Sequence, residues 1–295
     1  MNYILILVSV LAFTCNGFGT RLFQTKFEKA ERRLPLYQAL FCLISTFCFW
    51  GAGNFALPTL ETAVYGIIFG ILFCLATAMG AKGYATGSMA LTSVIINMSL
   101  IVPILYSVIF LHEKLTLLHI IGFILFCISV VCSAFTKGEN KKANLLWIIV
   151  VLIGFCANGS TATIQKMYVM NSSVNQDSVF LAVAYATATL CFTGKYFIAS
   201  RKEKKDLDGA KISFPYIAKF IGVALLAGVG SFGGNLLLGR LATQVNAAVL
   251  YPCINGGLAI CTTLVSFIIF HEKPTLQKIL SILVGCAAIV VLNLG

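Results

Sequence analysis

Long apolar stretches alternate with short polar connectors along almost the whole chain. A helix needs about 20 predominantly apolar residues to cross the roughly 30 Å hydrocarbon core of a bilayer. Ten segments meet this requirement: 3–20, 35–53, 62–80, 86–111, 117–135, 145–165, 178–199, 216–237, 245–270 and 276–294. The pattern therefore predicts an all-α integral membrane protein with ten transmembrane helices, the first of them retained as a membrane helix.

One charged motif occurs twice, each time between two of these apolar segments. Residues 109–117 read IFLHEKLTL and residues 268–276 read IIFHEKPTL, so six of the nine positions are identical. We call the two His-Glu-Lys triplets the glutamate boxes. They indicate two five-helix repeats, residues 1–136 and 145–295, joined by a connector at 137–144. Because each repeat has an odd number of helices, the second must enter the membrane in the opposite orientation, which predicts an inverted repeat.

Composition and charge favour a membrane protein and argue against nucleic-acid binding. Hydrophobic residues make up 59% of the chain and charged residues 11%, whereas charged residues are usually about a quarter of a soluble domain. The net charge of +11 comes from Lys and Arg in the connectors, where they orient helices and contact anionic lipid. Only Lys114, Lys166 and Arg240 lie on the side of the termini, so the positive-inside rule predicts that both termini lie outside the cytoplasm. We expect a multi-pass protein of the plasma membrane, with the lipid bilayer as its partner.

The titratable groups argue against an enzyme and against cation exchange. All ten acidic residues lie in connectors or at helix ends, whereas proton-coupled cation carriers commonly need a carboxylate inside the membrane. The glutamate box is not the zinc motif H-E-x-x-H, because Thr116 or Thr275 stands where the second His would be. The three histidines lie near interfaces without an acid-base cluster, and the 11 cysteines, with no C-x-x-C, are expected to be packing residues. We therefore expect no catalytic residue, metal or cofactor, and a neutral, zwitterionic or anionic substrate.

Polar side chains follow one side of two predicted helices. At about 100° per residue, one stripe on segment 86–111 contains Ser88, Thr92, Ser99, Pro103 and Tyr106. The equivalent stripe on segment 245–270 contains Tyr251, Asn255, Thr262 and Ser266. Pro103, Pro252 and the pair Gly256-Gly257 are expected to interrupt these helices, which is tolerated only where protein or a cavity satisfies the freed backbone groups.

These stripes, with asparagines in the middle of other helices, predict a substrate site between the repeats. The candidate substrate-binding residues are Asn16, Thr92, Asn97, Ser99, Tyr106, Asn158, Tyr251, Asn255 and Thr262. Ordinary packing between helices is the alternative for each hydroxyl, and tying helices together is the alternative for Asn16 and Asn158. Lys82 and Arg240, at helix ends, could attract an anionic substrate or serve as interfacial anchors. The glutamate boxes could mark helix ends that make local pairs, or form the contact of a gate or hinge.

The two five-helix repeats, the glutamate boxes that close segments 86–111 and 245–270, and the apolar helix after each box resemble a known family. They are similar to the EamA-type, ten-helix members of the drug/metabolite transporter superfamily, and the resemblance covers nearly the whole chain. It implies a secondary transporter, commonly an exporter of amino acids or other small metabolites, with a central cavity lined by both halves. The chain departs from the family in that Pro103 and Pro252 lie at unequal distances from their boxes. Members are also generally pictured with cytoplasmic termini, and Phe13 stands about where the related small multidrug-resistance proteins carry a membrane glutamate.

We therefore expect a transporter that moves a small polar metabolite, such as an amino acid, by alternating access around a cavity between the repeats. Asn255, Tyr251 and Asn97 would supply hydrogen bonds to the substrate. A non-transporting membrane partner or a lipid-handling subunit is the alternative function. The sequence leaves open the substrate, the direction, the coupling ion and whether the chain forms a homo-oligomer.

Overall fold

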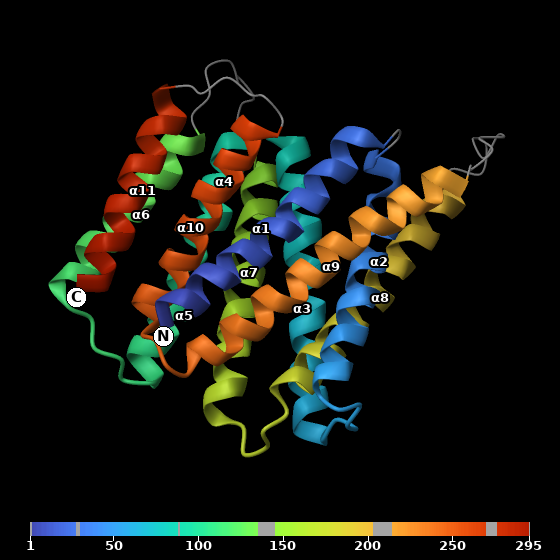
Figure 1. Ribbon diagram of the computed structural model, residues 1–295, viewed down its shortest axis with the longest axis horizontal. Coiled ribbons are helices and arrows are strands. Elements are labelled where there is room, and N and C mark those ends of the chain that lie inside the picture. Colours follow the sequence, from blue (N-terminus) through green and yellow to red (C-terminus); the bar gives the residue numbers. More distant parts are fainter. Residues whose placement is uncertain are drawn as a thin grey trace. The chain divides into compact units, whose positions relative to one another are not determined.

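The computed structural model describes residues 2–27, 30–87, 89–134, 145–202, 214–269 and 276–294 (Figure 1). The regular elements in these ranges are all helices. The connector at 137–144, Ser88 and the second glutamate box, at 271–273, lie outside them.

Every predicted apolar segment forms helix within these ranges. The elements are α1 (Asn2–Lys26), α2 (Ala30–Ala52), α3 (Leu60–Thr86), α4 (Met89–Met98), α5 (Ile101–Phe110), α6 (Leu117–Ala134), α7 (Leu145–Asn171), α8 (Asp177–Lys202), α9 (Phe214–Ala242), α10 (Ala247–Ile268) and α11 (Leu276–Leu294). The helices α4 and α5 together correspond to the predicted segment 86–111. The ten predicted helices are thus confirmed, with one of them divided.

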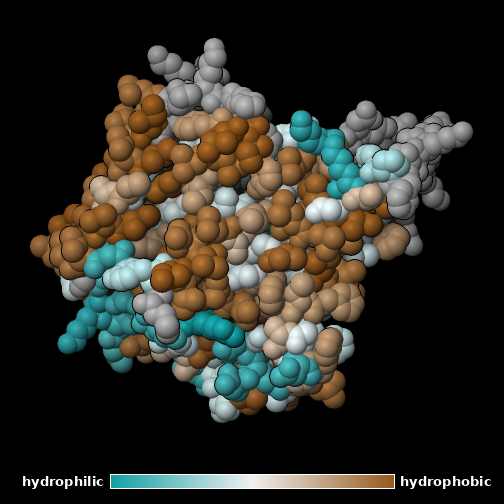
Figure 2. Space-filling view, in the orientation of Figure 1, coloured by the Kyte–Doolittle hydropathy of each residue, from teal (hydrophilic) through white to brown (hydrophobic). Residues whose placement is uncertain are grey.

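The helices have the length and surface of membrane spans. Within the described ranges, eight helices are long and apolar enough to cross a membrane, counting Leu91–Phe110 as one span. The helices after the two boxes, α6 and α11, contribute shorter apolar stretches. Figure 2 shows a face that is mostly hydrophobic, and many large apolar side chains on the helices are exposed, such as Leu283 at 61%. A multi-pass membrane protein accounts for this exposed apolar surface.

The chain forms two compact units, and neither coincides with a sequence repeat. The first unit comprises Met1–Val10, Leu75–Ser172 and Leu237–Gly295, and the second comprises Leu11–Cys74 and Ser173–Leu236. Each unit therefore combines helices from the segments 1–136 and 145–295.

In the first unit, α6 packs along α11, and α10 packs against α11, α6 and α5 (Figure 1). Ser129 of α6 and Ser281 of α11 each donate a hydrogen bond to the other's carbonyl oxygen, at 2.8 and 2.9 Å. The helices α4 and α5 pack against α7. A buried cluster joins these elements and contains Leu100, Ile104, Phe126, Val130, Ala247, Ala248, Tyr251 and Ala288.

In the second unit, α2 packs along α8, and α3 approaches α8 through glycines. A Cβ added at Gly70 would lie 2.4 Å from the carbonyl oxygen of Ala184, and one at Gly66 would lie 2.8 Å from Val183. The two backbones meet closely because neither glycine has a side chain. Close packing of helices thus explains this small-xxx-small motif.

Candidate functional site

The span Leu91–Phe110 is broken near its middle, where α4 ends at Met98 and α5 begins at Ile101. The cause lies at Pro103, which has no N–H to donate to the carbonyl of Ser99, the usual partner one helical turn before it. The N–H of Val102 bonds to that carbonyl instead, at 3.0 Å, and the N–H of Ser99 bonds to the carbonyl of Ile96 at 3.2 Å. The predicted interruption of this helix is therefore confirmed, on the N-terminal side of the proline.

The helix α7 packs directly against the break. Asn158 donates a hydrogen bond from Nδ2 to Oγ of Ser99 at 2.7 Å, and Ser99 is fully buried. At the next residue, Gly159, an added Cβ would lie 2.7 Å from the carbonyl oxygen of Ser99. The amide of Asn158 and the backbone of Gly159 thus contact the irregular turn. The structure therefore brings two predicted site residues, Ser99 and Asn158, together.

Two other members of the α4–α5 stripe, Thr92 and Tyr106, also bond to α7. Thr92 is fully buried and accepts a hydrogen bond from Nε1 of Trp147 at 2.9 Å. The hydroxyl of Tyr106 accepts a hydrogen bond from Nδ2 of Asn171 at 3.3 Å. The stripe predicted from the helical period therefore forms one side of the span despite the break, and in this conformation it pairs with α7 at both of these residues.

The candidates on α10 and on α4 itself bond mainly to backbone. Tyr251 is 3% exposed and donates its hydroxyl to the carbonyl of Ala162 on α7 at 3.3 Å. Asn255 and Asn97 donate to carbonyls one turn back on their own helices, at 3.0 and 2.8 Å. Thr262 does the same, to Leu258 at 2.7 Å. The predicted interruption of the second stripe is wrong, because α10 runs from Ala247 to Ile268 through both Pro252 and the glycine pair.

Three candidates lie away from this group. Asn16 belongs to the second unit, where its Nδ2 donates to the carbonyl of Ala227 on α9 at 2.9 Å, tying α1 to α9. Lys82 near the end of α3 and Arg240 near the end of α9 are exposed. Ser266 has no described side chain.

The first glutamate box forms a network that connects three elements of the first unit. The carboxylate of Glu113 pairs with the ammonium of Lys166 on α7, and its other oxygen accepts the N–H of Ala247, the first residue of α10, at 2.7 Å. The side chain of Lys166 is fully buried, and that of Glu113 is 18% exposed. Asn246 adds a bond from Nδ2 to the carbonyl of Lys114 at 3.0 Å, and its Oδ1 caps α10 at the N–H of Ala248. We call Glu113, Lys166, Asn246 and Ala247 the latch.

A strained turn presents Glu113 to these partners. His112 has a φ of 54°, in the left-handed region that few residues other than glycine adopt. The N–H of Glu113 then bonds back to the carbonyl of Ser107 at 3.1 Å, which closes the end of α5. The interpretation of this box as a source of local pairs is therefore wrong for Glu113, whose partners are distant in sequence. In the predicted ten-span topology, few basic residues fall on the side of the termini. This rarity is the signal in the sequence that could have singled out Lys166.

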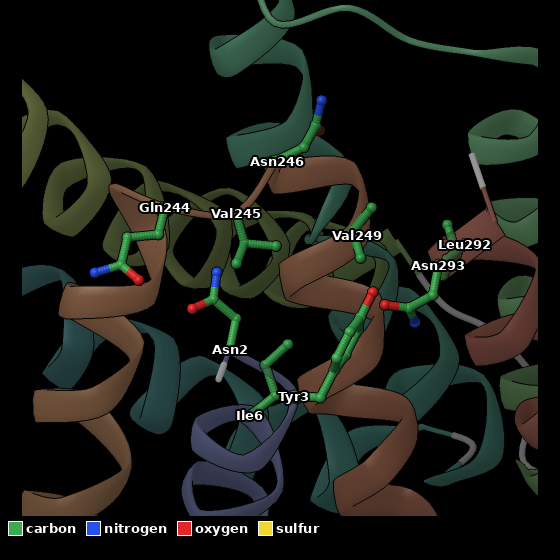
Figure 3. Close-up of a pocket in the computed structure, with 9 residues that line it drawn as sticks. All are labelled: Asn2, Tyr3, Ile6, Gln244, Val245, Asn246, Val249, Leu292 and Asn293. Atoms are coloured by element: carbon green, nitrogen blue, oxygen red, sulfur yellow. The ribbon is translucent and has the colours of Figure 1, made fainter.

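A cavity of about 430 Å³ lies beside the latch, at the start of α10 (Figure 3). It is lined by the beginning of α1, the α9–α10 connection, the first turn of α10 and the end of α11. Its polar lining consists of Asn2, Tyr3, Gln244, Asn246 and Asn293. In Figure 3 the hydroxyl of Tyr3 points toward the amide of Asn293. Sequence reasoning missed this cavity because its lining residues come from helix termini that are far apart in the chain.

A second polar cluster that the sequence did not single out lies in the second unit. The buried hydroxyl of Tyr185 on α8 bonds to the hydroxyl of Ser231 on α9 and accepts a hydrogen bond from Nδ2 of Asn235 at 3.0 Å. The rings of Phe49 and Phe73 pack against Tyr185, with centroids 5.3 and 5.7 Å away. A hydrogen-bonded group inside an aromatic shell of this kind fixes the packing of its helices.

Comparison with known proteins defines the fold. No family model matches the sequence, and no curated protein matches it. Among 28 matching chains of solved structures, one described as "Crystal structure of protein" covers 99% of this chain and 97% of its own. The TM-score is 0.68 and the sequence identity 12%, so the similarity shows a shared fold across the full length of the chain.

Proposed function

We propose that the chain is a secondary transporter that moves a small polar metabolite, such as an amino acid, by alternating access. In this proposal the two sequence repeats are inverted relative to each other, and the chain belongs to the EamA-type drug/metabolite transporters. The observation that carries the proposal is the break in the span Leu91–Phe110, where Ser99 meets Asn158.

A break at this position suits a substrate site. Irregular backbone at membrane depth is tolerated only where protein buries it or where it lines a cavity. Transporters commonly form their substrate sites from such discontinuous helices. The hydroxyl of Ser99 and the amide of Asn158, which satisfy each other here, are uncharged groups that can exchange this bond for bonds to a solute. They favour a neutral or zwitterionic substrate over a cation.

Ligand-dependent stability of the purified protein tests this proposal. A ligand at 100 times its dissociation constant stabilises the native state by about 2.7 kcal/mol. We expect one class within a panel of amino acids, nucleobases, sugar phosphates and lipophilic cations to raise the unfolding temperature. Asn158→Leu should abolish that shift, whereas Gly194→Ala, at a site with nothing within 4 Å, should retain it. A folded protein that no compound stabilises would contradict the proposal.

A non-transporting membrane partner or lipid-handling subunit is the second candidate. The pairing of Thr92 with Trp147 and of Tyr106 with Asn171 favours it, because these polar groups already serve helix packing. The variant Asn255→Leu tests one predicted substrate ligand of the transporter. Asn255 donates to its own helix backbone, so we expect the variant to keep normal abundance. If Asn255 binds the substrate, the variant should lose transport. Unchanged transport in this variant would remove Asn255 from the site.

A further inference from the structure

The cavity beside the latch has the lining of a site for polar, uncharged groups. Four of its residues, Asn2, Gln244, Asn246 and Asn293, carry carboxamides, which both donate and accept hydrogen bonds. Tyr3 adds a hydroxyl, and none of the described residues that line the cavity carries a charge. A volume of about 430 Å³ is in the range of small-molecule sites. This chemistry fits solutes that are neutral or zwitterionic.

The first turn of α10 separates this cavity from the buried interior of the first unit. Val249 of this turn lines the cavity, whereas Ala247 and Ala248 belong to the buried cluster. One turn further along from Val249 lies Cys253, which is 3% exposed. The amide of Asn293, which also lines the cavity, covers this thiol and donates to its Sγ at 3.3 Å. Displacement of the beginning of α10 away from Asn293 would therefore expose Cys253 to the cavity.

The latch holds this first turn in place, and one of its members, Asn246, also lines the cavity. Glu113 accepts the N–H of Ala247, and Asn246 bonds to the carbonyl of Lys114. The residues after α5 are thus hydrogen-bonded to the beginning of α10. The pairing with the buried Lys166 fixes the carboxylate of Glu113 for this role. Removal of one partner of such a buried charge pair is strongly destabilising, so the pairing stabilises the contact between the residues after α5 and the beginning of α10.

We propose that this cavity is a vestibule for neutral and zwitterionic polar solutes, and that the latch holds its α10 wall closed. The vestibule rests on the proposed transport function, since it gives the solute a route into the first unit. The latch must open for the solute to pass beyond Val249. Glu113 and Lys166 are thus positioning residues that control access, and they do not contact the solute.

Thiol labelling of the full chain tests the latch without requiring transport. A small, water-soluble methanethiosulfonate is applied to the purified protein, and mass spectrometry measures the modification rate at each cysteine. We expect Glu113→Gln to accelerate labelling of Cys253 at least about fivefold. An increase of this size in the population of molecules with an open latch requires only a small change in free energy. Lys166→Met should act in the same direction. This second variant removes a charge whose burial is costly, so it should fold readily.

Cys42 provides the control. It is fully buried in the second unit and reports general loosening. The proposal requires faster labelling of Cys253 with an unchanged rate at Cys42. Equal acceleration at Cys253 and Cys42, or an unchanged rate at Cys253 in both variants, would overturn the latch.

Protection of Cys253 tests the solute class. In Glu113→Gln, we expect serine to slow labelling of Cys253, whereas arginine and aspartate at the same concentration should have less effect. Equal protection by all three amino acids, or none by any, would overturn the vestibule. If only this protection experiment fails, the proposal of a substrate site at the break near Ser99 still stands, because it has its own ligand test. The two proposals are therefore tested separately.

Discussion

The pair of Glu113 and Lys166 illustrates how much of this structure depends on single side chains. A fully buried ammonium is tolerated because a carboxylate neutralises it. The same carboxylate satisfies a backbone N–H that the start of a helix leaves unpaired. Removing either partner therefore has consequences that exceed the loss of one contact.

We expect Glu113→Ala to cost about 3–5 kcal/mol of unfolding free energy, because it leaves the charge of Lys166 buried and unpaired. Lys166→Met should cost less, and combining it with Glu113→Ala should recover part of the loss. Reversible denaturation in mixed detergent micelles measures these differences. Glu61→Gln, at a partly exposed position near the start of α3, is the control and should have a much smaller effect. Strictly additive effects of the two latch variants would show that the pair is not coupled.

The turn at His112 makes a prediction that depends on backbone geometry alone. A φ of 54° is unfavourable for a residue with a Cβ, so His112→Gly should be neutral or stabilising, by up to about 1 kcal/mol. His112→Val should be destabilising, because branching at Cβ makes this conformation worse. Thermal unfolding of the two variants checks the order. If Gly were the more damaging replacement, the exposed imidazole itself would have a role that the turn does not explain.

At the scale of helices, the contact between α7 and the break in α4–α5 depends on the absence of a side chain at Gly159. Gly159→Ala would place a Cβ 2.7 Å from Ser99 and Val102, so we expect a loss of about 1–3 kcal/mol and weaker ligand binding. Gly194→Ala on α8 is the matched control and should be neutral or slightly stabilising, since alanine favours helix. Unfolding free energies of both variants test this. Equal effects of the two substitutions would contradict close packing at the break.

The helical elements could be predicted because apolar length and helical period are local properties. The stripe of Thr92, Ser99 and Tyr106 was correct as one side of a span, but its pairing with α7 could not be seen without the packing partner. Pro103 breaks its helix, whereas Pro252 lies within the continuous α10. The two prolines look alike in sequence, so the sequence pattern alone does not distinguish them. Glu113 was noticed as a motif, but its partners on α7 and α10 are set by the tertiary fold.

At the scale of the whole molecule, the sequence repeats and the compact units divide the chain differently. Each unit takes helices from both repeats, so neither repeat has to fold as a body by itself. The boundary at 137–144 follows from the duplicated box and lies outside the described residues. The inverted relation of the repeats stays a prediction.

The distribution of basic residues predicts the orientation of the chain. In the predicted ten-span topology, Lys114, Lys166 and Arg240 alone among the Lys and Arg fall on the side of the termini, so we expect that side to face away from the cytoplasm. A C-terminal alkaline phosphatase fusion should then be active, and a C-terminal green fluorescent protein fusion should be dark. A bright fluorescent fusion with an inactive phosphatase would reverse the orientation and agree with the cytoplasmic termini usual for the resembled family.

Counterflow in proteoliposomes tests the transport proposal most directly. Vesicles are loaded with an unlabelled compound from the class that stabilises the protein, and entry of the labelled compound is followed. We predict transient accumulation with the wild-type chain and with Gly194→Ala, and none with Asn158→Leu. Binding of the compound without counterflow in the wild-type chain would contradict transport and favour a membrane protein that binds its ligand without moving it.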